Sequence, residues 1–273
     1  MKQLSTFILL LLLGFAANAQ LIYRYYTETR PGIFKDRIPK VIYQRLVTFY
    51  DEYAVKELTA LHFDSTGLQT EKIEYDDSGK VTGRMVWHFE QPGRQLKYLA
   101  GNVWSAGKFS SDSALFHYDS KGFLNEVILK NDQNTLLRQA FITCDSIGNP
   151  IESNFYDNRG NLLSAEYARY LPERNKILIR QVKTDGSEPR TDSIDIDKRY
   201  AAKYAAAGET YNDRGDLIRS ENYKPFKGKA VLEIFYRYDE FGNPAEISMF
   251  KVRGKGRMKR SEAHATIYRT YEY

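Results

Sequence analysis

A short pattern recurs along this chain: an aromatic residue, an aspartate, two variable residues and a glycine. An Asp at the start of a turn accepts hydrogen bonds from N–H groups two residues on, and the later Gly adopts the left-handed conformation without steric cost. Each copy therefore predicts the corner of a β-hairpin, with the ring ending the incoming strand. The corner residues are Asp64 and Gly67, Asp76 and Gly79, Asp119 and Gly122, Asp145 and Gly148, Asp157 and Gly160, Asn212 and Gly215, and Asp239 and Gly242.

The spacing of the copies indicates an internal repeat. Phe89–Gly93 is a looser copy, and Cys144 replaces the aromatic residue in another. Counted between aromatic positions, neighbouring copies lie 12 (63 to 75), 14 (75 to 89), 26 (118 to 144), 12 (144 to 156) and 27 (211 to 238) residues apart. These distances are one or two multiples of a strand-plus-turn unit.

The segments between corners alternate between apolar and polar residues. In Val81–Phe89, Met85 and Trp87 share one face with Gly83, and Leu232–Tyr238 alternates in the same way. A period of two is typical of an antiparallel strand with one buried face, and the 21 Tyr and 15 Phe residues suit strands. The predicted fold class is all-β: an antiparallel meander of consecutive β-hairpins forming an elongated, twisted or curled repeat sheet.

The corners Tyr156–Leu162 and Tyr238–Asn243 resemble the tyrosine–aspartate (YD) repeats of the Rhs and teneurin families. The resemblance covers about residues 60–250 and implies hairpins that add side by side into a long spiralling sheet. The spacing here is irregular, with 43 residues between 75 and 118 and 55 between 156 and 211. The chain is also too short to enclose a toxin and shows no toxin domain, so the cocoon function of the large family members is not implied.

The first nineteen residues are typical of a secretory signal peptide. Lys2 supplies the positive start, an apolar run extends to Phe15, and Ala17-Asn18-Ala19 is a cleavage site before Gln20. We predict residues 1–19 as the signal peptide, 20–59 as N-terminal capping strands and 60–273 as the YD-like hairpin repeat domain. The mature protein is expected to be exported, periplasmic or extracellular, without a transmembrane helix or a lipoprotein anchor.

Several segments outside the corners are less regular. Residues 21–50, with Tyr23, Tyr25 and Tyr26, are predicted to form one or two strands that cover the open edge of the sheet. Gly101–Ser113 is predicted as a loop, and 184–190 as the best break between two halves. The Ala-rich stretch 200–208 fits either a short helix or a strand of small residues.

Net charge is a modest +5, spread along the chain, so nucleic acid is not expected as a partner. The densest basic run lies between 251 and 260. Its simplest interpretation is a solvated hairpin loop between the last two strands, and the alternative is contact with anionic lipid headgroups or an acidic partner.

No pattern of catalytic or metal-binding residues accompanies the repeat. His62, His88 and His117 lie beside corner aromatics and are expected to face solvent, and Cys144 is expected to be a structural thiol. The pair Asp76-Asp77 lacks the acidic spacing of a calcium loop, so turn formation explains it. We predict no enzymatic activity, no catalytic or metal site and no cofactor.

Three hypotheses of function remain after these exclusions. The leading hypothesis is a non-enzymatic binding or scaffold module at the cell envelope, whose partner is an unknown envelope protein, glycan or lipid. One alternative is a periplasmic carrier that folds curled strands around an apolar or lipid ligand. The other is a glycan-binding module that stacks sugars on a Tyr/Phe face, although the same rings also stabilise a sheet through cross-strand pairs.

Overall fold

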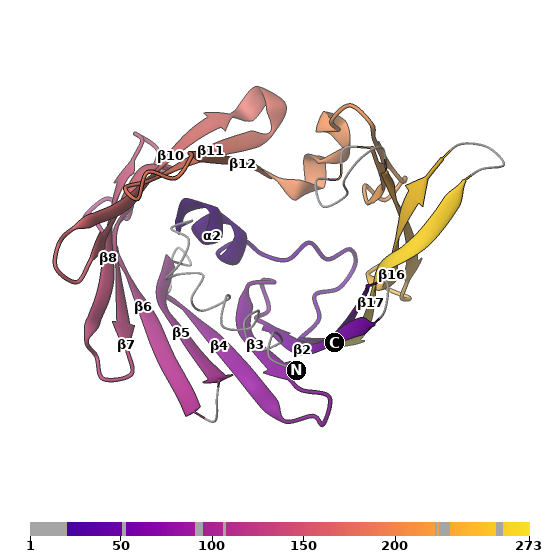
Figure 1. Ribbon diagram of the computed structural model, residues 1–273, viewed down its shortest axis with the longest axis horizontal. Helices are drawn as coiled ribbons and strands as arrows, with labels where there is room; N and C mark the ends of the chain where they lie inside the picture. The colour runs from indigo at the N-terminus through magenta and orange to yellow at the C-terminus, as the bar shows by residue number, and fades with distance from the viewer. Residues whose placement is uncertain are drawn as a thin grey trace. The chain divides into compact units, whose positions relative to one another are not determined.

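The computed structural model of the protein describes residues 21–50, 53–90, 95–105, 108–221, 223, 230–254 and 259–273. Within these ranges, β-strands make up nearly all of the regular structure (Figure 1). Seventeen strands belong to a single sheet, and each pairs antiparallel with its partner. The prediction of an all-β antiparallel meander is confirmed.

The strands follow one another along the chain with few interruptions. They are β1 (Val41–Phe49), β2 (Ala54–Phe63), β3 (Gln69–Tyr75), β4 (Val81–Glu90), β5 (Gln95–Ser105), β6 (Lys108–Tyr118), β7 (Leu124–Asn131), β8 (Leu136–Cys144), β9 (Pro150–Asp157), β10 (Leu162–Leu171), β11 (Lys176–Lys183), β12 (Arg190–Asp195), β13 (Glu209–Tyr211), β14 (Leu217–Ser220), β15 (Val231–Tyr238), β16 (Pro244–Arg253) and β17 (Arg260–Glu272). The helices are α2 (Leu21–Glu28) and three 3-10 turns, η1 (Pro172–Arg174), η2 (Lys198–Tyr200) and η3 (Ala202–Tyr204).

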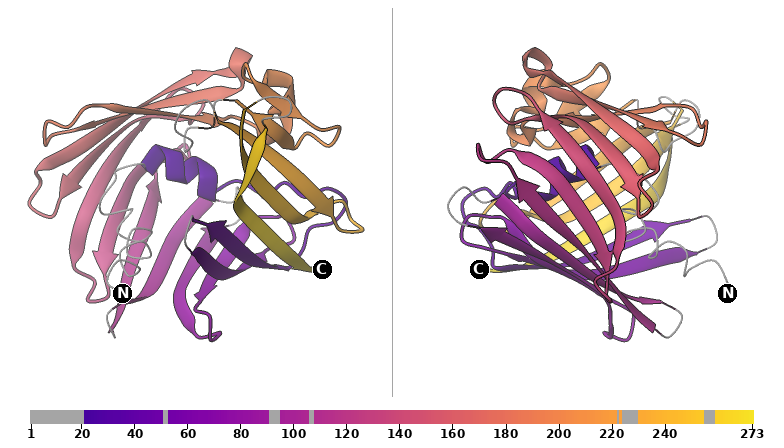
Figure 2. Two further views of the ribbon diagram at one scale, coloured as in Figure 1. Left: turned by 45° about the vertical axis from the view of Figure 1, so that its right-hand side comes forward. Right: turned by 90° about the vertical axis from the view of Figure 1, so that its left-hand side faces the viewer.

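The chain forms two compact units. Unit 1 comprises the described residues of Met1–Pro31, Leu68–Ile73 and Val81–Ile196. Its strands β4 to β12 pair in sequence order, each with the next, as a simple meander requires. Figures 1 and 2 show the strands of unit 1 as an arc with α2 against its inner side.

Unit 2 comprises Gly32–Gly67, Glu74–Lys80 and the described residues of Asp197–Tyr273. Here β1 pairs with β2 on one side and with β17 on the other, so Ile42 lies opposite both Leu61 and Tyr271. The expectation that residues 21–50 cap a sheet edge is therefore wrong for β1, which lies inside the sheet. β1 contains no proline, so each of its residues keeps the backbone N–H group that pairing on either side requires.

Some local expectations fail for identifiable reasons. Residues 21–28 form α2 rather than a strand, because apolar side chains at 21, 22, 25 and 26 fall on one helical face. The predicted loop Gly101–Ser113 consists mostly of β5 and β6, which pair from Tyr98 to Ser105. Residues 184–190 are not the break between two halves but the turn between β11 and β12, and unit 1 continues to Ile196. The stretch 200–208 contains η3 and no strand, so its short-helix alternative is the correct one.

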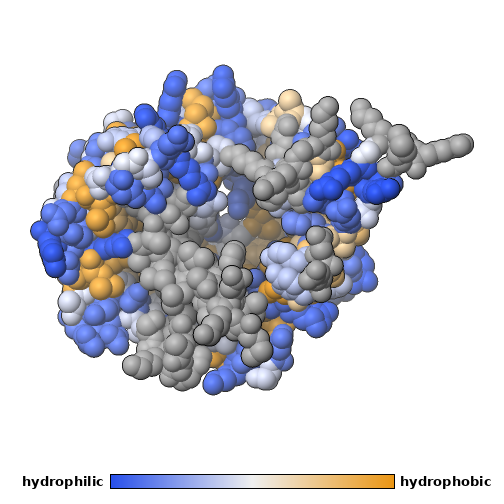
Figure 3. All heavy atoms as spheres, viewed as in Figure 1, coloured by the Kyte–Doolittle hydropathy of each residue, from blue (hydrophilic) through white to orange (hydrophobic). Residues whose placement is uncertain are grey.

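Each unit has its own hydrophobic core. In β4 the side chains of Met85 and Trp87 are buried as the alternation predicts, whereas neighbouring His88 is exposed. In unit 2 the buried set centres on Leu232, Ile234 and Ile247. On the molecular face drawn in Figure 3, hydrophilic residues predominate among the described side chains, with hydrophobic ones scattered between them.

Candidate binding site

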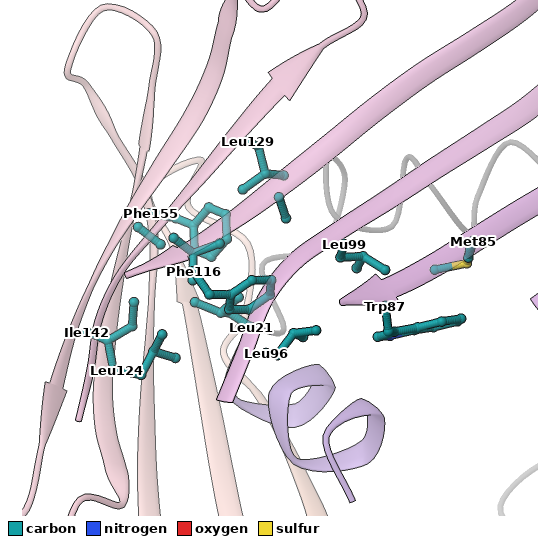
Figure 4. Packing of buried hydrophobic residues seen from close by; sticks show 13 residues of the cluster. Leu21, Met85, Trp87, Leu96, Leu99, Phe116, Leu124, Leu129, Ile142 and Phe155 are labelled. Carbon is teal, nitrogen blue, oxygen red and sulfur yellow. The ribbon is translucent and has the colours of Figure 1, made fainter. Parts of the chain in front are cut away.

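One side of the unit 1 sheet carries a continuous cluster of buried apolar side chains, which we call the apolar face. Figure 4 shows these side chains together with the nearby helix α2. The sheet contributes them from six consecutive strands, β4 to β9. They are Met85, Trp87, Leu96, Leu99, Ala114, Phe116, Leu124, Val127, Leu129, Ala140, Ile142 and Phe155.

The strand register places two large rings at the ends of a row of smaller side chains on this face. In one row Phe116 lies opposite Val127, Val127 opposite Ala140, and Ala140 opposite Phe155. Side chains directly opposite one another on neighbouring strands are the contacts that stabilise a sheet. The two phenylalanine rings therefore flank the smaller Val127 and Ala140, whose side chains project less far from the sheet.

Helix α2 lies on the same side of the sheet and joins two clusters. Leu21 is buried in the apolar face, with Tyr25 one turn later packed against the same cluster. Ile22 is buried against Ile177 and Ile179 of β11. Residues four apart share one helical face, so this short helix presents two adjacent apolar stripes.

The C-terminal end of α2 is held by polar contacts. The hydroxyl of Tyr170 donates to Tyr26 Oη at 2.6 Å and lies 2.9 Å from the Pro150 carbonyl oxygen. Arg30, just beyond the helix, places its guanidinium 4.6 Å from the centre of the Tyr26 ring and donates to the Asp195 carbonyl. These contacts fix α2 to β9, β10 and β12 in addition to its apolar packing.

The helix is too short to cover the whole apolar face by itself. Eight residues extend about 12 Å along a helix, whereas six neighbouring strands are about 24 Å across. Helix α2 therefore spans only part of the apolar face. In addition, the indole nitrogen of Trp87 is buried on this face without a hydrogen-bond partner among the described residues.

Beside the apolar face lies a small buried set of polar side chains, which we call the polar patch: Ser153, Ser164, Glu166 and Gln181. The register brings Ser153 opposite Glu166 and Glu166 opposite Gln181 across β9, β10 and β11. Ser164 lies opposite Phe155, where the patch meets the apolar face. All four are buried, with Ser153 and Glu166 at 0% exposure and Ser164 at 3%.

Glu166 caps the N-terminus of α2 from a distant strand. Its Oε2 accepts a 2.8 Å hydrogen bond from the Ile22 amide, and the Leu21 amide also bonds to the carboxylate. The first N–H groups of a helix have no partner within the helix and carry partial positive charge. Because α2 has no acidic residue in its own first turn, Glu166 supplies the missing acceptor.

Burial dominates the electrostatics of Glu166. The pKa of the carboxyl is raised to about 8: burial is the main cause and the charge of Asp192 adds to it, while the hydrogen bonds from Ile22 and Leu21 act in the opposite direction. A buried carboxylate without a cationic partner is costly. The patch is therefore a place where a hydrogen-bond donor or a cation would be favoured.

The predicted corner residues lie in turns and are distributed over both units rather than gathered at a site. In each of Asp119, Asp145, Asp157, Asn212 and Asp239, one side-chain oxygen accepts from the amides two and four residues later. Asp76 does the same, and Asp64 accepts from Thr66. The glycines Gly67, Gly79, Gly122, Gly148, Gly160, Gly215 and Gly242 have φ values between 77° and 90°. The looser corner Phe89–Gly93 lies partly outside the described residues.

Sequence reasoning missed one corner of the same kind. Asn131 accepts from the amides of Gln133 and Thr135, and Asn134 takes the left-handed conformation with φ 59°. This corner lacks the recurring sequence pattern because Asn replaces both the Asp and the Gly. Its position divides the long gap: 131 − 119 is 12, 145 − 131 is 14, and 157 − 145 is 12. Four corners in unit 1 are thus nearly evenly spaced.

Unit 2 contains a polar cluster that is fully engaged. The amide of buried Asn243 donates to Tyr273 Oη at 2.9 Å, and its carbonyl accepts from the Lys35 backbone N–H at 3.1 Å. Tyr273 in turn bonds to Asp239, and Arg37 stacks 5.2 Å from the Tyr273 ring centre. These polar groups form hydrogen bonds with one another, so the role of the cluster is structural: it holds β16 and β17 to the segment around residue 36.

The remaining candidates for chemistry are dispersed. In the described ranges no group of His, Cys, Asp and Glu side chains is arranged to hold a metal ion. His88 and His117 are exposed, as expected. Cys144 is half-buried against the apolar cluster and donates to the Leu124 carbonyl at 3.3 Å, and burial raises its pKa to about 11. A thiol with that pKa is a poor nucleophile at neutral pH.

Within the described residues, no helix has the length and apolar character needed to cross a membrane. No protein-family model and no curated protein matches the chain.

Several solved structures are similar at low identity. A porin-like protein from Bacteroides uniformis is 9% identical with a TM-score of 0.40, and the match covers 88% of this chain and all of the other. TcdB2-TccC3 without its hypervariable C-terminal region is 11% identical with a TM-score of 0.36, over 77% of this chain but 14% of that one. A LolA superfamily protein from Nitrosomonas europaea is 13% identical with a TM-score of 0.18, over 65% of this chain and 91% of that one. TM-scores this low carry no argument about function.

Proposed function

We propose that the protein is an exported, non-enzymatic binding module of the cell envelope, and that unit 1 binds an apolar ligand such as a lipid acyl chain. The observation that carries this proposal is the apolar face, which extends over six strands, of which the eight-residue helix α2 spans only part. Apolar surface of that extent is stabilised when another apolar group removes it from water.

The composition of the surroundings also supports a ligand site. Small-molecule sites in proteins are mostly apolar and carry a few placed polar groups. Here the apolar face borders the polar patch at Phe155 and Ser164, and the Trp87 indole N–H is a buried donor that a ligand oxygen would satisfy. An amphiphile with a long apolar part and a small polar group fits this combination.

The tyrosine rings favour this site over a glycan site. Corner hydroxyls that would contact sugars are used inside the protein: Tyr118 donates to the Leu96 carbonyl, and Tyr238 bonds to Asp216. Tyr236 likewise donates to the Leu217 carbonyl. These rings and hydroxyls join neighbouring strands, which is the structural role that a repeat sheet needs.

The location and the repeat type belong to the same proposal. The signal-peptide pattern of residues 1–19 supports export, and the envelope is where a lipid ligand is available. The Asp and Gly geometry of the corners supports kinship with YD repeats, used here for a small ligand-binding sheet.

Native mass spectrometry of the mature protein, purified from its own envelope without detergent, tests the proposal. We expect a bound mass that is lost on denaturation and has the fragmentation of an acyl lipid. The variant Phe116→Ala should lower the occupancy, while Phe141→Ala, on the exposed side of the same sheet, should leave it unchanged. A clean apo mass with correct folding would overturn the ligand proposal and point to a protein or glycan partner.

A further inference from the structure

Three polar atoms of the polar patch are buried without a hydrogen-bond partner among the described residues: Ser153 Oγ, Ser164 Oγ and Glu166 Oε1. Their side chains are 0%, 3% and 0% exposed. Buried polar atoms without partners are rare, because each costs free energy relative to its hydrated state. Three of them on the neighbouring strands β9 and β10 indicate that a group with hydrogen-bond donors belongs here.

The register continues the polar patch directly into the apolar face. Ile142 on β8 lies opposite Ser153, and Phe155 on β9 lies opposite Ser164. Both Ile142 and Phe155 belong to the apolar face. Side chains directly opposite one another on neighbouring strands are in contact. An apolar chain that lies on the apolar face can therefore reach the polar patch with one end.

The three unpartnered atoms are close enough to share one small group. Ser153 lies opposite Glu166, where Cβ atoms are about 5 Å apart, and Ser164 precedes Glu166 by two residues, about 7 Å along the strand. A charge-assisted N–H···O hydrogen bond is about 2.8 Å long, so an ammonium nitrogen joins acceptors up to about twice that distance apart. A primary ammonium has three N–H donors, one for each of these atoms.

The charges around Glu166 also favour a cation. The charge of Asp192 repels the carboxylate of Glu166. The cations of the neighbouring segments are directed elsewhere: Arg190 Nε lies 2.8 Å from Asp192 Oδ2, and the charge of Lys183 acts on Asp185. A buried carboxylate is tolerated when an opposite charge and hydrogen bonds accompany it. An ammonium supplies both, whereas a carboxylate or phosphate group is repelled.

We infer that the polar patch binds the head group of the ligand, and that this head group is a protonated primary amine carried by a long apolar chain. The ammonium bonds to Glu166, Ser153 and Ser164, and the chain lies on the apolar face. Glu166 thereby determines specificity, selecting an ammonium over a hydroxyl and rejecting anionic head groups. The inference rests on the proposed function, because it defines the polar end of the ligand that the apolar face binds.

Isothermal titration with three probes that share one alkyl chain length tests the inference: decylamine, decanol and decanoate. At pH 7 the amine is cationic, as a lysine side chain is, the alcohol is neutral and the carboxylate is anionic. The protein is first freed of bound amphiphiles on a hydrophobic resin. We expect decylamine to bind at least about tenfold more tightly than decanol, and decanoate to bind most weakly, because a buried charge pair separates the three probes.

A pair of matched variants assigns the selection to one carboxylate. Glu166→Gln removes the charge but keeps the size of the side chain and an oxygen that accepts from Ile22. In this variant decylamine and decanol should bind within about twofold of each other. Glu152→Gln is the control, because Glu152 adjoins Ser153 on β9, points to the opposite side of the sheet and bonds to Asn154. It should keep the full preference for decylamine.

Proton release gives a second readout that needs no variant. Burial is the main reason why the pKa of Glu166 is raised to about 8, so the free protein holds this proton at pH 7. A cation beside the carboxyl favours its ionised form. On binding, the ammonium keeps its protons and the carboxyl passes its proton to the buffer. Titrations in buffers of different ionisation enthalpy should therefore show about one proton released for each decylamine bound, and none for decanol.

The outcomes separate this inference from the proposed function. Equal binding of decylamine and decanol without proton release would overturn the inference and leave apolar binding intact, with water filling the polar patch. If the folded protein bound none of the three probes, the inference and the proposed function would both be wrong. A preference for decylamine that persists in Glu166→Gln would also overturn the inference, because the selection would not come from Glu166.

Discussion

The backbone amide of Ile22 donates a 2.8 Å hydrogen bond to the buried carboxylate of Glu166, 144 residues later in the chain. This single contact joins the start of α2 to the middle of the unit 1 sheet. Glu166 belongs to the polar patch, and Ser164 lies two residues before it on the same side of β10. Since Ser164 is opposite Phe155, the patch borders the apolar face. The helix, the patch and the face therefore form one site.

Glu166 should give the stability of unit 1 a distinctive pH dependence. Its folded pKa is raised to about 8 from 4.5, mainly by burial and further by Asp192, so between these values the folded state holds a proton that the unfolded state has lost. The free energy of unfolding must then fall as pH rises from about 5 to 8, by up to about 1.4 kcal/mol per pH unit. Urea denaturation of the protein across this range measures the slope.

One control variant accompanies this measurement. Glu166→Gln should remove the slope, since the amide does not titrate. An unchanged slope in Glu166→Gln would assign the pH dependence to other groups.

The apolar contact of α2 should contribute strongly to stability. Ile22 is 1% exposed and packs on Ile177 and Ile179. Replacing a buried Ile by Ala costs about 2–5 kcal/mol, so Ile22→Ala should lower the urea midpoint clearly. Ile147→Ala is the matched control, because Ile147 is 77% exposed in a corner, and it should change the stability by less than about 0.5 kcal/mol. Equal effects would show that α2 does not pack as described.

The corner glycines should differ in how much they tolerate a side chain. Gly148 and Gly160 share the left-handed conformation, with φ 90° and 81°. A Cβ on Gly148 would lie 2.7 Å from the Phe123 ring, while nothing lies within 4 Å of one on Gly160. Gly160→Ala should cost about 1–2 kcal/mol for the backbone alone, and Gly148→Ala should cost more. Thermal unfolding of the two variants measures both costs. A smaller loss of stability in Gly148→Ala than in Gly160→Ala would contradict the geometry.

The corners were predictable from sequence because their geometry is local. An Asp and a Gly three residues apart determine a turn almost regardless of the rest of the chain, and the strands between them follow from alternation. The same locality explains the missed corner at Asn131, where two Asn residues substitute for Asp and Gly. Asn reaches the left-handed conformation at lower cost than other side chains, so it forms the turn without showing the motif.

The candidate site was not predictable in this way. Ser153, Glu166 and Gln181 meet only through the register of three strands, which no sequence window contains. Glu166 lies between Ala165 and Tyr167, and a charged residue in a strand is ordinarily assigned to the solvent face. Helix α2 was not predictable from sequence for another reason. Its three tyrosines favour strands by composition, and only the packing of Leu21 and Ile22 against two clusters decides for a helix.

Quenching of Trp87 fluorescence by brominated acyl chains tests the central claim most directly. Trp87 lies on the apolar face, and Trp104→Phe leaves it as the single tryptophan of the protein. Bromine quenches an indole only at close contact, so we predict saturable quenching of Trp87 by a lipid brominated in its acyl chain. The quenching should weaken in Phe116→Ala and persist in Phe141→Ala. A folded protein whose Trp87 emission is unaffected at saturating lipid would contradict binding on the apolar face.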